Sequence, residues 1–79
     1  MKAIIYSNRT IECERAEALL SACDFDEVIT YYKDRHFNDA QFLDEFGEEA
    51  EYPQISIGIN HIGGLKDTLH YLSDKGMFV

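Results

Sequence analysis

Short apolar runs alternate along this chain with segments in which apolar residues recur every three or four positions. Residues 2–6 (KAIIY) and Glu27–Tyr32 (EVITYY) are nearly continuous runs rich in β-branched and aromatic side chains, which is typical of strands. Between them, residues 10–23 predict a helix, because their apolar positions fall on one stripe. That stripe consists of Cys13, Ala16, Leu19, Leu20 and Cys23.

A second helix is predicted from the residues at its start. Asn38 is a favourable N-cap, and Gln41 occupies the capping-box position three residues later. Phe37 and Phe42 are spaced as a hydrophobic staple, and Gly47 is suited to end the helix. Its buried side is expected to consist of Phe42, Leu43 and Phe46, and the acidic segment that follows (EEAE, 48–51) is expected to be an exposed loop.

The remaining residues predict two strands and a helix. PQISIG (53–58) begins a third strand, and the turn chemistry of residues 58–60 leads into a short fourth strand that stops at Gly63-Gly64. A last helix is expected to bury Leu65, Leu69 and Leu72, and Gly76 closes it.

The order β-α-β-α-β-β-α predicts an α/β fold. The first two strands are expected to pair in parallel through a right-handed crossover, and the last two to form an antiparallel hairpin. One four-stranded mixed sheet flanked by three helices accounts for every element. With 79 residues, the chain (1–79) is expected to form a single domain.

The net charge of −8 limits the possible partners. Nucleic acid is an unlikely ligand because its binding depends on Lys and Arg neutralising phosphates, and an anionic membrane is disfavoured for the same reason. An acidic surface can instead select a basic protein, or serve solubility alone.

The cysteines and the N-terminus favour a cytoplasmic location. The apolar run near the start is too short for a signal-peptide core or a membrane span. Cys13 and Cys23 lie roughly 15 Å apart if they share one helix, so they cannot form a disulfide, and Cys23 is expected to be structural. The three histidines, on a loop, a strand and a helix, lack metal-ligand spacing, so no metal site is predicted.

Three segments of the chain resemble glutaredoxins, small members of the thioredoxin fold. They are IIYSNRTIECERAEALL, YPQISIGINHIGG and GGLKDTLHYL, and together they span nearly the whole sequence. The resemblance implies a thioredoxin-like fold. It also implies that the proline matching Pro53 is cis, and that the backbone of Tyr52 pairs with an extended thiol substrate.

The resemblance also implies a glutathione site. Gly63 and Gly64, ahead of the last helix, would hold the γ-glutamyl carboxylate at free N–H groups, and Asp67 would receive the amino group. Asn8 lies near the place of a lysine that often meets the glycine carboxylate, and Arg9 could substitute for it.

The chain departs from the family at the sulfur itself. When CERAEALL is aligned, Cys13 takes the place of the second motif cysteine and Thr10 that of the first; aligned from the strand, Cys13 matches neither. A threonine hydroxyl cannot perform thiol exchange. Thr10 is therefore expected to be the N-cap, its oxygen accepting from the N–H of Cys13, and it could also donate a hydrogen bond to the sulfur.

Two interpretations of Cys13 remain open. A position in the first helical turn favours the thiolate, and Arg9 and Arg15 could add to this effect. Glu12 and Glu14 oppose ionisation, as does the burial, at least partial, that the apolar stripe predicts. Cys13 is therefore either redox-active or a quiet core thiol.

The first functional hypothesis is a glutathione-dependent thiol–disulfide oxidoreductase that uses Cys13 alone, assisted by Thr10. Glutathione would be a co-substrate, with no tightly bound cofactor, and the partners would be disulfide-containing or glutathionylated proteins. Small glutaredoxins commonly feed electrons to ribonucleotide reductase. The single-cysteine branch that shares an iron–sulfur cluster uses the first-position cysteine, which this chain lacks.

Two other hypotheses belong to different classes. The same groove could bind glutathione or an extended peptide without catalysis. Alternatively, the chain could be a small interaction protein whose acidic surface meets a basic partner.

Overall fold

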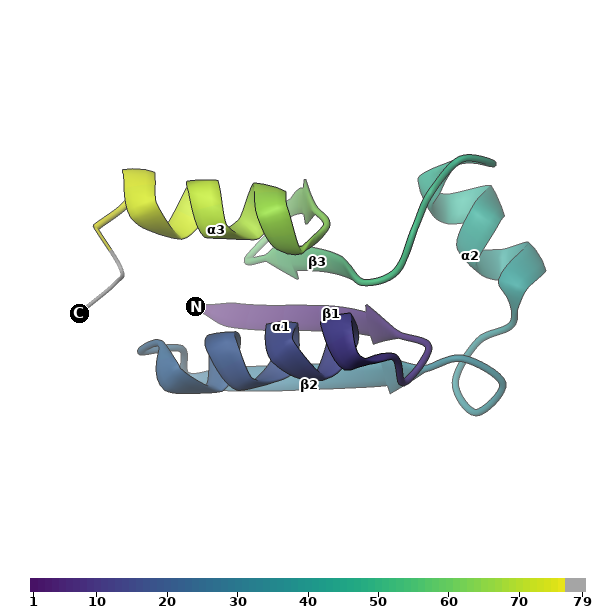
Figure 1. Ribbon diagram of the computed structural model, residues 1–79, viewed down its shortest axis with the longest axis horizontal. Helices are drawn as coiled ribbons and strands as arrows, with labels where there is room; N and C mark the ends of the chain where they lie inside the picture. Colours follow the sequence, from purple (N-terminus) through teal and green to yellow (C-terminus); the bar gives the residue numbers. More distant parts are fainter. Residues whose placement is uncertain (77–79) are drawn as a thin grey trace.

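The computed structural model describes residues 1–76, which form one four-stranded sheet (Figure 1). Its order is β2-β1-β3-β4, and β1 pairs with β2 in parallel and with β3 in antiparallel orientation. The predicted hairpin of β3 and β4 is antiparallel, with a register shift between Ile55 and Ser56. The predicted α/β fold with a mixed sheet is confirmed, and the arrangement is thioredoxin-like. The strands are β1 (Lys2–Ser7), β2 (Glu27–Tyr32), β3 (Gln54–Ile57) and β4 (Asn60–Gly63).

Two of the three helices share one face of the sheet. Helix α1 (Ile11–Ala22) packs against β1 and β2, and α3 (Leu65–Asp74) packs against β3 and β4 and also touches α1. Helix α2 (Asp39–Phe46) lies at the end of the sheet toward which β1 and β2 point (Figure 1). None of the helices within residues 1–76 is both long and apolar enough to cross a membrane.

The core lies between the sheet and the face covered by α1 and α3. Because side chains alternate along a strand, every second residue of β1 and β3 points toward these helices. Those residues meet the buried positions of the helices, and all of them are completely excluded from solvent. The cluster consists of Ala3, Ile5, Ala16, Leu20, Ile55, Ile57 and Leu72.

Two leucines predicted to be buried are exposed. Leu43 in α2 is 38% exposed and Leu69 in α3 is 40% exposed, so these two predictions were wrong. In α3 the buried side of the helix contains Thr68 and Leu72. Leu69 is displaced from that side by one residue and therefore lies at its border. Thr68 tolerates full burial because its hydroxyl donates to the carbonyl oxygen of Gly64 at 2.9 Å.

Helix α2 begins with the predicted capping box and packs through its aromatic side chains. The capping box is confirmed, because Asn38 Oδ1 accepts from the Gln41 N–H at 2.8 Å and Gln41 Oε1 accepts from the Asn38 N–H at 2.9 Å. The Phe46 ring lies 5.0 Å from that of Tyr6, and the Phe42 ring 4.0 Å from that of Tyr52. Rings at these separations stabilise the contact beyond the area they bury.

Candidate functional site

The Tyr52–Pro53 peptide bond is cis, as the resemblance implied. Pro53 is buried and directly precedes β3. No hydrogen bond between described residues uses the backbone N–H or C=O of Tyr52. Since backbone polar groups seek partners, these two groups are available to an extended ligand chain.

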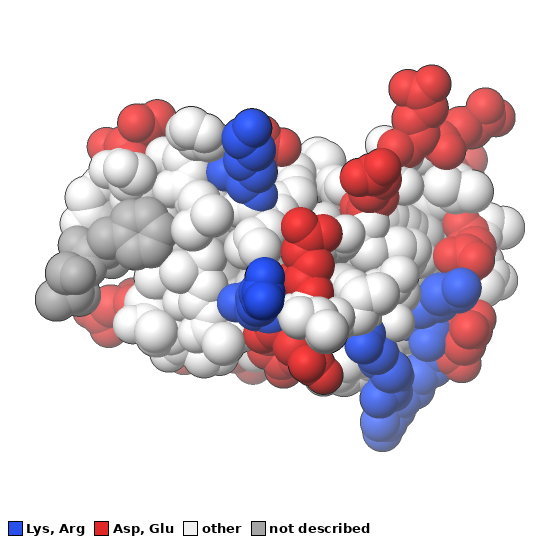
Figure 2. Space-filling model, in the orientation of Figure 1, with Lys and Arg blue, Asp and Glu red and all other residues white. Residues whose placement is uncertain are grey.

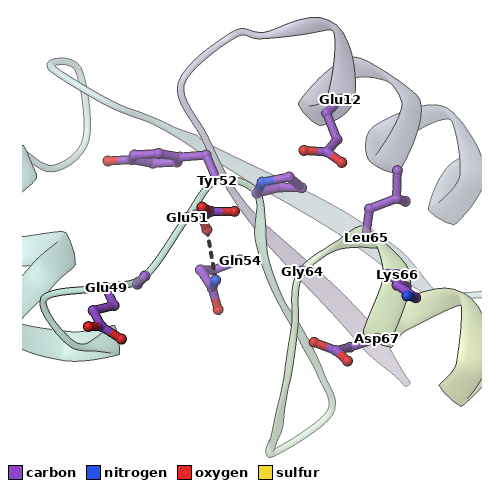
Figure 3. A pocket seen from close by; sticks show the side chains of 11 residues that line it. Glu12, Glu49, Glu51, Tyr52, Gln54, Gly64, Leu65, Lys66 and Asp67 are labelled. Carbon is purple, nitrogen blue, oxygen red and sulfur yellow. Dashed lines mark hydrogen bonds between the residues drawn. The ribbon is translucent and has the colours of Figure 1, made fainter.

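A groove of about 330 Å³ opens at this proline. That volume lies near the lower limit of small-molecule sites, which span about 300–1,000 Å³. Three parts of the chain line it: the first turn of α1, the segment before β3 and the first turn of α3 (Figure 3). Of the predicted site residues, the groove contains Tyr52, Pro53, Gly64 and Asp67.

The Gly63-Gly64 pair shapes the α3 side of the groove. Gly63 has φ 126°, and a Cβ placed on it would lie 2.6 Å from Asp67 Oδ2. The Asp67 carboxylate thus occupies the space that a side chain at Gly63 would need. Gly64 is the N-cap of α3 and provides no side-chain cap, so the first-turn N–H groups remain open to an acceptor.

The sulfur of Cys13 lies beneath two polar side chains. The Thr10 hydroxyl donates to Cys13 Sγ at 3.3 Å, and Cys13 Sγ donates to Asn8 Oδ1 at 3.2 Å. Donation by Thr10 favours a thiolate, whereas donation by the thiol to Asn8 favours the protonated sulfur. Cys13 is only 1% exposed, in agreement with the burial that the apolar stripe predicted.

Thr10 is the N-cap of α1 by backbone geometry, with φ −77° and ψ 166°, but its side chain makes no capping hydrogen bond. The prediction that its oxygen accepts from the N–H of Cys13 was therefore wrong. The hydroxyl is directed to the sulfur instead, which is the second role that the sequence suggested for it. Thr10 itself is exposed, whereas the sulfur that its hydroxyl contacts is buried.

Asn8 and Arg9 do not line the groove. The Asn8 side chain instead accepts the hydrogen bond from Cys13 Sγ through its Oδ1. Arg9 has φ 67°, its N–H donates to Ser7 Oγ at 3.0 Å, and its guanidinium lies 4.3 Å from the centroid of the Tyr32 ring. The predicted residues therefore fall in three places. Tyr52, Pro53, Gly64 and Asp67 line the groove, Thr10 and Asn8 contact the Cys13 sulfur, and Arg9 stacks on Tyr32 of β2.

The phenol of Tyr52 connects the groove to α2. It donates to Asp39 Oδ1 at 3.0 Å, and Asp39 Oδ2 pairs with Lys33 Nζ at 3.0 Å. Burial and the Asp39 carboxylate raise the pKa of Tyr52, and hydrogen bonds from Lys33 and Tyr52 lower the pKa of Asp39. The loop that carries the cis proline is therefore tied to the start of α2.

The sequence reasoning missed Gln54. Its side chain is nine-tenths buried, its Nε2 donates to the carbonyl oxygen of Glu51 at 2.7 Å, and its Oε1 lies 2.7 Å from His61 Nε2. These bonds fix the backbone just before Tyr52. The available signal was a polar residue directly after the only proline, but nothing in the sequence showed where its amide would bond.

The groove also contains charged residues that were not predicted as site residues. They include Glu12, Glu49, Glu51 and Lys66. Glu49 and Glu51 belong to the segment expected to be a simple exposed loop. Within residues 1–76, no group of three or more His, Cys, Asp or Glu side chains is arranged to hold a metal ion.

Comparison of the chain with models of known protein families and with curated proteins found no match.

Proposed function

We propose that this protein is a glutaredoxin-like, glutathione-dependent thiol–disulfide oxidoreductase that works through Cys13. The observation that carries the proposal is the hydrogen bond from Thr10 Oγ1 to Cys13 Sγ at the first turn of α1. The adjacent residue, Glu12, lines the groove that contains the cis proline. A sulfur that receives a donor bond at a helix N-terminus is the arrangement that favours a nucleophilic thiolate.

The reaction proceeds in two exchanges. The Cys13 thiolate attacks the glutathione sulfur of a protein–glutathione mixed disulfide, forms a Cys13–glutathione disulfide and releases the protein thiolate. A second glutathione thiolate then attacks the glutathione sulfur of this intermediate, which releases oxidised glutathione and restores the Cys13 thiolate. The net reaction reduces the protein sulfur to a thiol and consumes one free glutathione, which leaves joined to the glutathione of the original mixed disulfide as oxidised glutathione.

The groove residues have distinct roles in this proposal. The free backbone groups of Tyr52 pair with the cysteinyl part of glutathione, beside Pro53. The open N–H groups that follow Gly64 receive the γ-glutamyl carboxylate, and Asp67 receives its ammonium group.

The proposed setting is the reducing cytoplasm, in keeping with two free cysteines. Partners are glutathione and disulfide-containing or glutathionylated proteins, with ribonucleotide reductase among those that the resemblance suggests. The rate is low, since a 1% exposed sulfur must become accessible before it can attack.

A second candidate function is a non-catalytic module that binds glutathione or a peptide. The burial of Cys13 favours it, because a thiol closed off by its neighbours does not exchange. In this case the groove is used for binding alone.

The test is the reduction of a glutathionylated peptide by the purified protein and its cysteine variants. We expect Cys13→Ser to reduce the rate to the uncatalysed level and Cys23→Ser to preserve it, because Cys23 follows the other end of α1. Circular dichroism of both variants verifies that they are folded.

Alkylation of native protein at neutral pH distinguishes the two candidates. Labelling of Cys13 without denaturant supports the oxidoreductase. Labelling only after unfolding, or full activity in Cys13→Ser, rejects it, and the first of these outcomes supports the binding module.

A further inference from the structure

The groove at the cis proline is strongly acidic. Four carboxylates line it, from Glu12, Glu49, Glu51 and Asp67, and one ammonium group, from Lys66. None of the four carboxylates belongs to an ion pair within residues 1–76, where the ion pairs join Met1 to Asp26, Lys2 to Glu27 and Lys33 to Asp39. The negative charge of the groove is therefore not neutralised by the protein itself.

Figure 2 shows acidic side chains in the middle of one face, between the segments labelled α1 and α3, with basic side chains around them. The nearest arginine along α1, Arg15, does not line the groove. The positive end of α3 contributes about half an elementary charge, which is too little to offset the excess of carboxylates. The potential in the groove is thus negative.

One of the four carboxylates, that of Glu51, is attached to a backbone segment fixed by a hydrogen bond. Gln54 is nine-tenths buried and donates to the carbonyl oxygen of Glu51, so the backbone carrying this carboxylate is fixed beside Tyr52 (Figure 3). On the opposite wall, the Asp67 carboxylate packs over Gly63. Carboxylates from separate segments therefore line the same groove as Tyr52.

A negative groove discriminates between possible ligands. Glutathione brings two carboxylates and one ammonium group; Asp67 suits the ammonium, but the carboxylates meet only Lys66 and the helix N-terminus. A polypeptide with Lys or Arg beside its cysteine brings cations to a wall of carboxylates and can pair with the Tyr52 backbone as well.

We propose that the groove selects an extended polypeptide segment with Lys or Arg on both sides of its cysteine, in preference to an acidic segment. This inference rests on the proposed function only in placing the docked chain at Tyr52 and Pro53; it does not require Cys13 to react. The carboxylates are exposed, so the preference depends on ionic strength.

The test measures binding of peptides in which serine replaces the cysteine, flanked by lysines or by glutamates, so that no exchange can occur. We expect the lysine-flanked peptide to bind about five- to tenfold tighter at low ionic strength, and most of this ratio to disappear near ~1 M salt. The double variant Glu12→Gln/Glu51→Gln should reduce the ratio below about twofold. Glu48→Gln, which removes a charge from the same loop outside the groove, should preserve it.

Equal affinities for the two peptides, a preference for the acidic peptide, or an equal loss in Glu48→Gln would overturn the inference. Failure of every peptide to bind would also overturn it. These outcomes are independent of the exchange assay: charge-selective binding without exchange keeps the inference and rejects the enzyme, and exchange without charge selectivity does the reverse.

Discussion

Two polar neighbours act on the Cys13 sulfur in opposite directions. The Thr10 hydroxyl donates to it, which stabilises a thiolate, while Asn8 Oδ1 accepts from it, which stabilises a thiol. Hydrogen bonds to charged groups are worth about 1.5–3 kcal/mol, about twice those to neutral groups. Thr10 is therefore the neighbour whose hydrogen bond would support a nucleophilic sulfur at this position.

This balance predicts the effect of Thr10→Val on reactivity. The rate of Cys13 alkylation at neutral pH should fall about tenfold or more, because the thiolate loses its donor. The free energy of unfolding should change little, since the Thr10 side chain makes no capping bond. Thr10→Ser retains the hydroxyl and should keep the rate, so a loss in both variants would show that the hydrogen bond is not responsible.

At the scale of elements, the β4–α3 junction explains why a glycine precedes the N-cap. Gly63 has a positive φ, and its missing side chain leaves room for the Asp67 carboxylate. Gly64 has φ −83°, and a Cβ there would lie 3.6 Å from the carbonyl oxygen of Pro53, an ordinary contact. The two glycines thus differ in how strictly the backbone requires them.

The comparison of two alanine substitutions tests this difference. Gly63→Ala should lower the free energy of unfolding by about 1–3 kcal/mol, because an L-residue is strained at this φ and its Cβ displaces Asp67. Gly64→Ala should cost much less. Urea unfolding measures both, and similar losses in the two variants would contradict the account of the junction.

For the whole molecule, the aromatic rings of α2 contact two tyrosines outside the helix, Tyr6 through Phe46 and Tyr52 through Phe42. Burial is the main cause that raises the pKa of Tyr6 and of Tyr52, and in Tyr52 the Asp39 carboxylate raises it further. The unfolded chain releases these phenol protons near pH 10, the folded chain only above it. The folded state therefore binds more protons above pH 10, and stability should fall there.

Urea unfolding at increasing alkaline pH is the corresponding measurement. We expect the free energy of unfolding to be insensitive to these phenols below about pH 9 and to decline from about pH 10 upward. Tyr52→Phe should make this decline shallower. Tyr71→Phe, outside these aromatic contacts of α2, serves as the control, and an equal effect of the two variants would argue against a special role of Tyr52.

The sequence predicted the elements of the fold more accurately than the burial of individual side chains. Hydrophobic spacing, capping residues and turn chemistry together located all seven elements, and the boundaries of α1 differ only in that Thr10 and Cys23 are its caps. Spacing could not assign Leu43 and Leu69, since apolar residues at the border of a stripe are buried only if a neighbouring element covers them. For Leu69, the polar Thr68 took the buried position by bonding within its own helix.

The sequence by itself determined the order of the elements, the parallel pairing of β1 with β2 and the hairpin of β3 and β4, because these follow from local periodicity and chain connectivity. Tertiary structure alone decided that Cys13 is covered by Thr10 and Asn8, and that carboxylates from separate segments meet at one groove. Side-chain direction and the convergence of distant segments depend on packing, which no local pattern encodes.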